Sequence, residues 1–238
     1  MTHGAEPTPD FTVRFVVNKD DLRAAHALFR HRIGPELVEE FTGFRVSATV
    51  EAADWLPRLA VAVADGSPLG ADAPVAPAGN ADGETSSLPS RLIAAQLGGL
   101  LPAVAMVSLP YTAVAEGFEG RGVYLTVKRA MLAELRAMAA ARGLPPPVAN
   151  ISEEAPGSAQ YRRKVEGGIA VALPVAYAQP TALGLPERPL ALTYEPLVGP
   201  APAFTAADLR RIVAAVYRGL YRITDPETNP TFVRMFGG

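Results

Sequence analysis

The sequence predicts a mixed α/β (α+β) fold in which strands and helices follow one another along the whole chain. Short β-rich runs such as 12–17 are interleaved with segments of helical periodicity. A strand, a glycine-containing turn and a long helix follow one another at 113–142. Apolar residues make up 49% of the 238 positions, which suffices for a sizeable core. No internal repeat is visible, so we expect a single domain spanning 1–238.

Strands are expected where β-branched and other apolar residues run together between turn residues. These runs lie at 12–17, 59–64, 92–97, 104–114, 148–151, 169–173 and 190–194. The first helix is predicted to begin after the N-cap Asn18, with carboxylates in its first turn, and to end at Gly34. Further helices are expected over 35–41, 121–142, 157–165 and, within a C-terminal helical extension at 200–238, from Thr205 to Tyr221. Residues 44–56 favour neither state.

Residues 65–90 differ in composition from the rest of the chain. They contain four Gly, four Pro, four acidic residues and no basic residue, and their only large aliphatic side chains are Leu69, Val75 and Leu88. Such a segment buries too little apolar surface to offset its ordering entropy. We therefore expect a mobile acidic loop between two strands, either a surface insertion or a substrate lid.

Charge and composition exclude several classes of protein. The net charge of −2 provides no general attraction to nucleic acid or to an anionic membrane. The chain has no Cys, which excludes disulfides, thiolate metal sites and a Cys nucleophile. His26 and His31 are five positions apart, which does not place them on one helix face as a metal pair. No signal peptide is visible, so we expect a cytoplasmic protein with no nucleic-acid, membrane or metal partner.

The strand–turn–helix segment at 113–130 carries the clearest functional signal. Gly120 and Gly122 let the backbone turn sharply and approach a ligand closely. The first N–H groups of the following helix have no helical partner, and Arg121 adds a cation beside them, which favours a phosphate ligand. The segment lacks the G-x-x-x-x-G-K-[ST] pattern of a P-loop. It is also a poor dinucleotide fingerprint, because Leu125 stands where the third glycine is required.

The turn Glu119–Tyr124 resembles the acyl-CoA-binding turn of the GNAT superfamily of N-acyltransferases, whose pattern is [QR]-x-x-G-x-[GA]. Gly120, Arg121, Gly122 and Val123 fit this turn, whereas Glu119 replaces its Gln or Arg and Tyr124 replaces its last Gly or Ala. The expected order of elements over 11–197 is also similar to that of the family. The resemblance implies a mixed, mostly antiparallel sheet flanked by helices, here with an extra C-terminal helix.

The resemblance also implies acetyl-CoA as the cosubstrate and a set of residues that bind it. The set consists of Val114, Gly120, Arg121, Gly122, Val123, Tyr124 and Leu125, with Asn150 and Ser152 on the next strand. Asn150 and Ser152 either bond the pantetheine arm or cap the following helix. Basic side chains outnumber acidic ones two to one between 119 and 164, which agrees with a polyphosphate ligand.

Transfer to an amine requires a base, an oxyanion donor and an acid for the leaving thiolate. The resemblance makes Tyr161 the acid and a backbone N–H near Val114 the oxyanion donor. Glu116, beside the turn, is the first candidate for the base, and Glu153 and Glu154 are the others.

We therefore expect an N-acyltransferase that moves an acetyl or other acyl group from acyl-CoA to an amine of a small molecule or a protein. One alternative is a CoA-binding protein of the same fold without catalysis, which Glu119 and Tyr124 favour. Another is an acyltransferase that uses an acidic acyl carrier protein, docked by the basic cluster. Apolar strands and the last helix favour a homodimer, and the acceptor amine is not identified by any motif.

Overall fold

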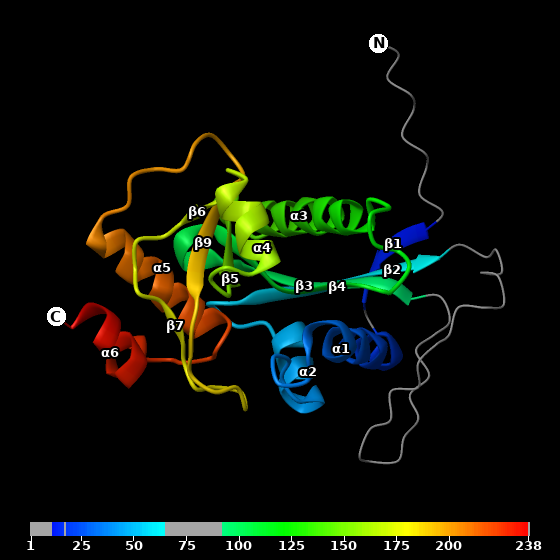
Figure 1. Cartoon of the computed structure of the whole chain (residues 1–238), viewed down its shortest axis with the longest axis horizontal. Helices are drawn as coiled ribbons and strands as arrows, with labels where there is room; N and C mark the ends of the chain where they lie inside the picture. Colours follow the sequence, from blue (N-terminus) through cyan, green and yellow to red (C-terminus); the bar gives the residue numbers. More distant parts are fainter. Residues whose placement is uncertain (1–10, 17, 65–91, 238) are drawn as a thin grey trace, which may run out of the picture.

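The computed structural model describes residues 11–16, 18–64 and 92–237 (Figure 1). The acidic loop expected at 65–90 lies outside these described residues. Among the described residues, no helix combines the length and the apolar character needed to cross a membrane.

A seven-stranded sheet forms the centre of the fold, in the order β1-β2-β3-β4-β5-β9-β6. Its strands are β1 (Phe11–Phe15), β2 (Leu56–Ala64), β3 (Leu92–Leu101), β4 (Met106–Val114), β5 (Ala149–Glu154), β6 (Val171–Ala172) and β9 (Ala191–Pro196). Every neighbouring pair is antiparallel except β4 and β5, which are parallel. The expected mixed, mostly antiparallel sheet is therefore confirmed.

Helices cover both faces of the sheet (Figure 1). α1 (Lys19–Ile33) and α2 (Phe41–Thr49) pack on one face, and α3 (Val123–Ala141) packs on the other. α5 (Ala206–Gly219) covers the β5–β9 half of the sheet. Met106 of β4 packs in the core with α5, whereas its neighbour Val107 packs with α3. Because successive side chains of a strand point to opposite faces, α5 lies on the face of α1 and α2.

Capping residues set several helix boundaries where the sequence predicted them. The Asn18 side chain accepts a hydrogen bond from the Asp21 N–H at 2.8 Å at the start of α1. Thr205 and Asp208 form a reciprocal capping box at the start of α5. α3 ends beside Gly143, which has a φ of +65°.

The helix predicted over 35–41 is wrong, and the second helix lies instead at 41–49. Gly34 ends α1 with a φ of +118°, and the segment that follows forms turns. The His26 ring bonds to the backbone oxygen of Glu39 at 2.8 Å, which anchors this segment to the core before α2 begins. Phe44 and Ala48 are the buried apolar side chains of α2, and both follow the predicted segment.

Several short elements have no counterpart in the sequence prediction. They are the β7 (Ala178–Gln179) and β8 (Arg188–Pro189) hairpin, α6 (Pro230–Phe236), and two 3₁₀ turns at Pro102–Val104 and Pro226–Thr228. The helix expected over 157–165 is α4 (Ala159–Tyr161), which continues directly into a π-helical turn at Arg162–Glu166.

Strands β4 and β5 pair over only three positions and then separate. The last pair is Ser108 with Ile151. Just beyond it, Leu109 and Pro110 of β4 oppose the single residue Gly98 of β3, which makes a β-bulge in β4. A bulge bends its strand, and proline has no N–H to offer to a neighbour. The bend turns the rest of β4 away from β5 and opens the sheet between them.

Candidate active site

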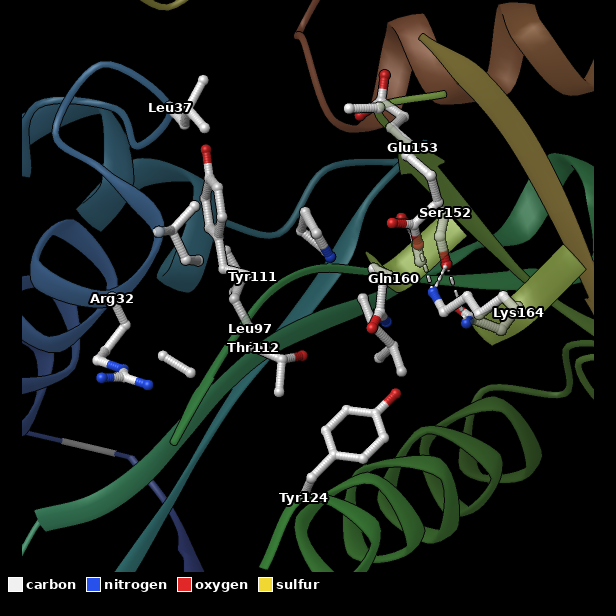
Figure 2. A pocket seen from close by; sticks show the side chains of 18 of the residues that line it. Arg32, Leu37, Leu97, Tyr111, Thr112, Tyr124, Ser152, Glu153, Gln160 and Lys164 are labelled. Carbon is white, nitrogen blue, oxygen red and sulfur yellow. Dashed lines mark hydrogen bonds and ion pairs between the residues drawn. The ribbon is translucent and has the colours of Figure 1, made fainter. Parts of the chain in front are cut away.

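A cavity of about 850 Å³ lies at the opening between β4 and β5. Its walls come from both faces of the sheet: β4 and β5 themselves, the turn before α3, the π-helical turn, the segment between α1 and α2, and the β7–β8 hairpin. Figure 2 shows Tyr124 at one end of this cavity, Tyr111 and Glu153 toward the other, and Lys164 reaching in from the side. The cavity therefore connects the α3 face with the α1–α2 face.

The second half of β4 presents unpaired backbone groups to this opening. The Ala115 N–H donates to the Ile93 oxygen of β3 at 2.7 Å. Because backbone groups alternate in direction along an antiparallel strand, those of Val114 and Thr112 point away from β3. β5 has already diverged there, so a ligand in the opening can bond to these groups. Val114, which the family resemblance places in the cosubstrate site, lines the cavity, and its binding role stays a prediction.

The start of α3 presents free N–H groups to the cavity. Gly120 and Gly122 have φ values of +74° and +77°, a conformation that favours glycine. Gly122 is the N-cap, has no side chain to cap the helix, and accepts the first helical bond from the Thr126 N–H at 3.0 Å. The N–H groups of Val123, Tyr124 and Leu125, which lie between Gly122 and Thr126, therefore have no helical partner. Five residues of the predicted ligand-binding set in this turn and helix line the cavity: Gly120, Gly122, Val123, Tyr124 and Leu125.

The two departures from the turn pattern have structural explanations. Glu119 forms an ion pair with Arg32 of α1, which compensates the carboxylate beside the expected phosphate site. The Tyr124 ring leans toward the π-helical turn, where the Arg163 guanidinium lies 5.3 Å from its centroid. In Figure 2 its hydroxyl points to the centre of the cavity. Arg121 instead lies 5.4 Å over the Phe118 ring and is not among the cavity-lining residues.

A polar group on the α3 side of β5 lines the cavity where the two strands part. The Lys164 ammonium donates to Glu154 Oε1 at 2.5 Å and to Ser152 Oγ at 3.1 Å. The Asn150 amide donates to Ser152 Oγ at 3.2 Å and to Glu195 Oε2 at 3.1 Å. Asn150 is 1% exposed, and its own Oδ1 has no partner in the described part of the chain. Asn150 and Ser152, both predicted, thus lie together at the opening.

A second ion pair, between Lys128 and Glu195, is hydrogen-bonded to this polar group through Asn150. Lys128 of α3 donates to both carboxylate oxygens of Glu195, at 2.5 and 2.8 Å. Burial by itself would raise the pKa of Glu195, but the hydrogen bonds from Lys128 and Asn150, together with the charges of Lys128 and Lys164, outweigh burial and leave this pKa lowered. Glu195 therefore stays charged and accepts a hydrogen bond from the Asn150 amide nitrogen. This bond fixes the orientation of the Asn150 amide at the cavity wall.

The two residues predicted to be catalytic do not line the cavity. Glu116 is exposed at the end of β4, and Tyr161 lies in α4, where its N–H bonds to the Ser158 hydroxyl at 3.1 Å. From the same helical segment, Gln160 and Lys164 reach the cavity instead. The roles of Glu116 and Tyr161 stay predictions. From the sequence, Lys164 was only one of the basic residues between 119 and 164, because the π-helical turn that aims it inward was not predicted.

Two carboxylates lie at the α1–α2 end of the cavity. Glu39 is 5% exposed and accepts hydrogen bonds from the Ser47 hydroxyl at 2.9 and 3.1 Å. Burial raises the pKa of Glu39 to about 7, although the Ser47 hydrogen bond and the nearby Arg222 guanidinium act in the opposite direction. A carboxyl with this pKa is suited to accept a proton near neutral pH.

Glu153, which the sequence analysis named as an alternative base, is the second of these carboxylates. It accepts hydrogen bonds from the hydroxyls of Tyr177 and Tyr221, the latter at 2.7 Å to each oxygen. Burial raises the pKa of Glu153, and these two hydrogen bonds oppose the rise. Burial and the charges of Glu39 and Glu153 together raise the pKa of Tyr111, which lies near both.

Neither carboxylate forms an ion pair within the ranges that the structure describes, nor do His, Asp or Glu residues there form a group of three that could hold a metal ion. Glu39, Tyr111 and Tyr221 were not singled out from the sequence. The sequence offers no signal for Glu39, and Tyr221 was named only as the expected end of a helix.

No family model matches this sequence, and no curated protein matches it. Solved structures match it in fold. A GNAT-family protein from Bacteroides thetaiotaomicron is 12% identical, with a TM-score of 0.53 over 90% of this chain and 99% of that one. NAA60 of Arabidopsis thaliana in complex with acetyl-CoA is 13% identical, with a TM-score of 0.51 over 79% of this chain and 99% of that one. The NatC complex bound to Gag peptide and CoA is 11% identical, with a TM-score of 0.50 over 80% and 100%.

These structures share the architecture of the N-acetyltransferases of the GNAT family. The present chain therefore has the GNAT fold, as its turn and its order of elements predicted.

Proposed function

We propose that this protein is a divergent GNAT enzyme that transfers an acetyl or other acyl group from acyl-CoA to an amine. One observation carries the proposal: a single cavity joins the free N-terminus of α3, the opening between β4 and β5, and a pair of buried carboxylates on the opposite face. The first two features suit a phosphorylated, extended ligand, and the third suits an amine that must lose a proton. The solved structures of this fold that contain acetyl-CoA or CoA support the choice of ligand.

In the proposed complex, the CoA phosphates bond to the N–H groups at the start of α3, and the pantetheine arm lies in the opening. The outward backbone groups of Thr112 and Val114 bond to the amides of the arm. The unpartnered Asn150 Oδ1 is a further acceptor at the cavity wall. The thioester then lies near the point where β4 and β5 separate, with the α1–α2 end of the cavity beyond it.

The amine acceptor enters from the α1–α2 end of the cavity. Its nitrogen attacks the acyl carbon, the carbon–sulfur bond breaks, and the proton lost by the nitrogen goes to a carboxylate. Glu39 and Glu153 are the candidates for this base, because both line the cavity and neither is held by a cation in the described chain. A backbone N–H of β4 near Val114 stabilises the oxyanion. The acceptor can be a small-molecule amine or a protein amine.

Binding of CoA tests the proposal most directly. Leu125 is the third residue of α3, is 51% exposed, and contributes one of the free N–H groups. Proline is tolerated in the first turn of a helix, so Leu125→Pro removes this donor with little other change. Leu125→Ala is the matched control, since it removes the same side chain and keeps the N–H.

A hydrogen bond to a charged group contributes about 1.5–3 kcal/mol, so Leu125→Pro should weaken CoA binding at least about tenfold in calorimetric titration. Leu125→Ala should bind as the wild type does. Equal binding by the two variants, or a wild-type protein that binds NAD or ATP as well as CoA, would contradict the proposed site.

A turnover assay that follows thiol release distinguishes the proposed enzyme from two alternative functions. A CoA-binding protein without catalysis binds CoA but releases no thiol from acetyl-CoA with any amine of a broad panel. An acyltransferase that uses a carrier protein releases thiol from an acyl carrier and not from free acyl-CoA.

A further inference from the structure

The position of Lys164 indicates a role in acyl transfer that rests on the proposed function. Lys164 lies in the π-helical turn at Arg162–Glu166, three residues after Tyr161. A π-turn advances the chain by one extra residue and so changes which side chains face inward. Here Lys164 faces the cavity and is 7% exposed. Figure 2 shows its side chain reaching toward Ser152 at the cavity wall.

The Lys164 ammonium lies at the point where the sheet opens. Its hydrogen-bond partner Ser152 is the first residue of β5 beyond Ile151, the last position paired with β4. A ligand arm that lies in the opening therefore comes close to this ammonium where the two strands part. Its charge is compensated by Glu154, whose side chain is as buried as that of Lys164, with 9% exposed in each case.

One donor of the ammonium is available to a ligand. An ammonium carries three N–H donors. Two are directed to Glu154 and Ser152, and the third has no hydrogen-bond partner among the described residues. Three other cations of the described chain lie at the cavity wall: Arg163 stacks on Tyr124, Arg32 pairs with Glu119, and Arg188 lies in β8 of the β7–β8 hairpin and not on the strands that part.

We propose that the Lys164 ammonium is a catalytic group that stabilises the leaving thiolate of CoA through its free N–H donor. When the carbon–sulfur bond breaks, the sulfur keeps the electron pair and forms an ion pair with Lys164 Nζ, which keeps its proton. The proton lost by the amine goes to a carboxylate at the other end of the cavity. The thiolate then takes a proton from water and the protonated carboxyl releases one to water, so that acyl-CoA and an amine give an amide and free CoA.

The test measures the pKa of the CoA thiol while CoA is bound to the full-length protein. Thiolate absorbs in the ultraviolet, so a pH titration of the saturated complex reports this pKa without any acceptor. An opposite charge within about 4–6 Å lowers such a pKa by about 1 unit or more. We expect that lowering in the wild type and its loss in Lys164→Met. Lys164→Arg, which keeps the charge, should retain part of the lowering.

Lys128→Met is the matched control. Lys128 is also the cation of an ion pair, and its side chain is 12% exposed. It is not among the residues that line the cavity. Lys128→Met should leave the pKa of the bound thiol lowered. Tyr161→Phe tests the acid predicted from the sequence, and Tyr124→Phe tests the hydroxyl that points into the cavity. Loss of the lowering in either variant, but not in Lys164→Met, overturns the proposal.

Loss of Lys164 alone leaves Glu154 buried and unpaired, which can unfold the protein. The double variant Glu154→Gln with Lys164→Met removes both charges and gives the same readout from a folded chain. If the wild type binds no CoA, the proposed function fails and this role fails with it. If CoA binds and its thiol pKa is the same in the wild type and in the folded variants, only the role of Lys164 is overturned.

Discussion

Glu39→Gln should make the protein progressively more stable than the wild type as the pH rises. Glu39 is 5% exposed, and burial raises its pKa from 4.5 to about 7 in the folded state. At pH values between 4.5 and about 7, Glu39 of the folded protein holds a proton that the same residue of the unfolded chain has lost. Stability therefore falls as the pH rises from about 4.5 to about 7, and the loss persists above this window.

The magnitude follows from the width of this window. A pKa raised from 4.5 to about 7 corresponds to about 3 kcal/mol between the two protonation states. The carboxylate therefore costs the folded protein about 3 kcal/mol at pH 8, where it is charged. Glutamine has a similar shape, can still bond to Ser47, and carries no charge at any pH. The difference in unfolding free energy between variant and wild type should thus grow by about 3 kcal/mol between pH 4 and pH 8.

Urea denaturation at one-unit pH intervals and constant ionic strength measures this difference. His26 contacts the Glu39 backbone and has a pKa lowered by burial, but it is present in both proteins, so its own titration largely cancels. Glu40→Gln is the matched control from the adjacent position. The hydrogen bond from Arg30 lowers the pKa of the exposed Glu40, so this variant should lose a little stability at high pH rather than gain it. Parallel stability curves for Glu39→Gln and the wild type would show that Glu39 is not desolvated.

Two further changes probe the packing around the site. Tyr221→Phe removes the hydroxyl that donates to both oxygens of Glu153 at 2.7 Å, and it should destabilise the protein by about 1–3 kcal/mol in urea denaturation. The loss should be larger at pH 8 than at pH 5, because ionisation of Glu153 increases with pH and a charged carboxylate accepts the stronger hydrogen bond. An equal loss at both pH values would mean that the hydroxyl does not act through the charge of Glu153. Gly99→Ala places a Cβ 2.6 Å from the Trp55 ring in a backbone conformation that alanine adopts freely, so overpacking should cost about 1–3 kcal/mol. Gly117→Ala meets no atom within 4 Å but lies at a φ of +80°, and a smaller loss there than at Gly99 is the expected control result.

Most of the fold could be predicted because the patterns that encode it are local. Strand runs, the Asn18 and Thr205 caps and the glycines of the turn act over a few residues, and the structure places each of them as expected. The second helix was misplaced because its start depends on a tertiary contact, the bond from His26 to the Glu39 backbone. The π-helical turn was missed for a related reason, since its register is set by the buried ion pair of Lys164 with Glu154.

The sequence by itself determined the half of the candidate site that we propose for the CoA phosphates. Glycines at positive φ and free helix N–H groups belong to one continuous segment, so their spacing along the chain is also their arrangement in space. Only the tertiary structure decided the other half. Glu39, Glu153 and Tyr221 come from segments more than 60 residues apart, and they meet because the bulge in β4 opens the sheet and α5 packs beside the opening. Their burial, and with it the raised pKa values that suit the carboxylates to accept a proton, exists only once those segments have packed together.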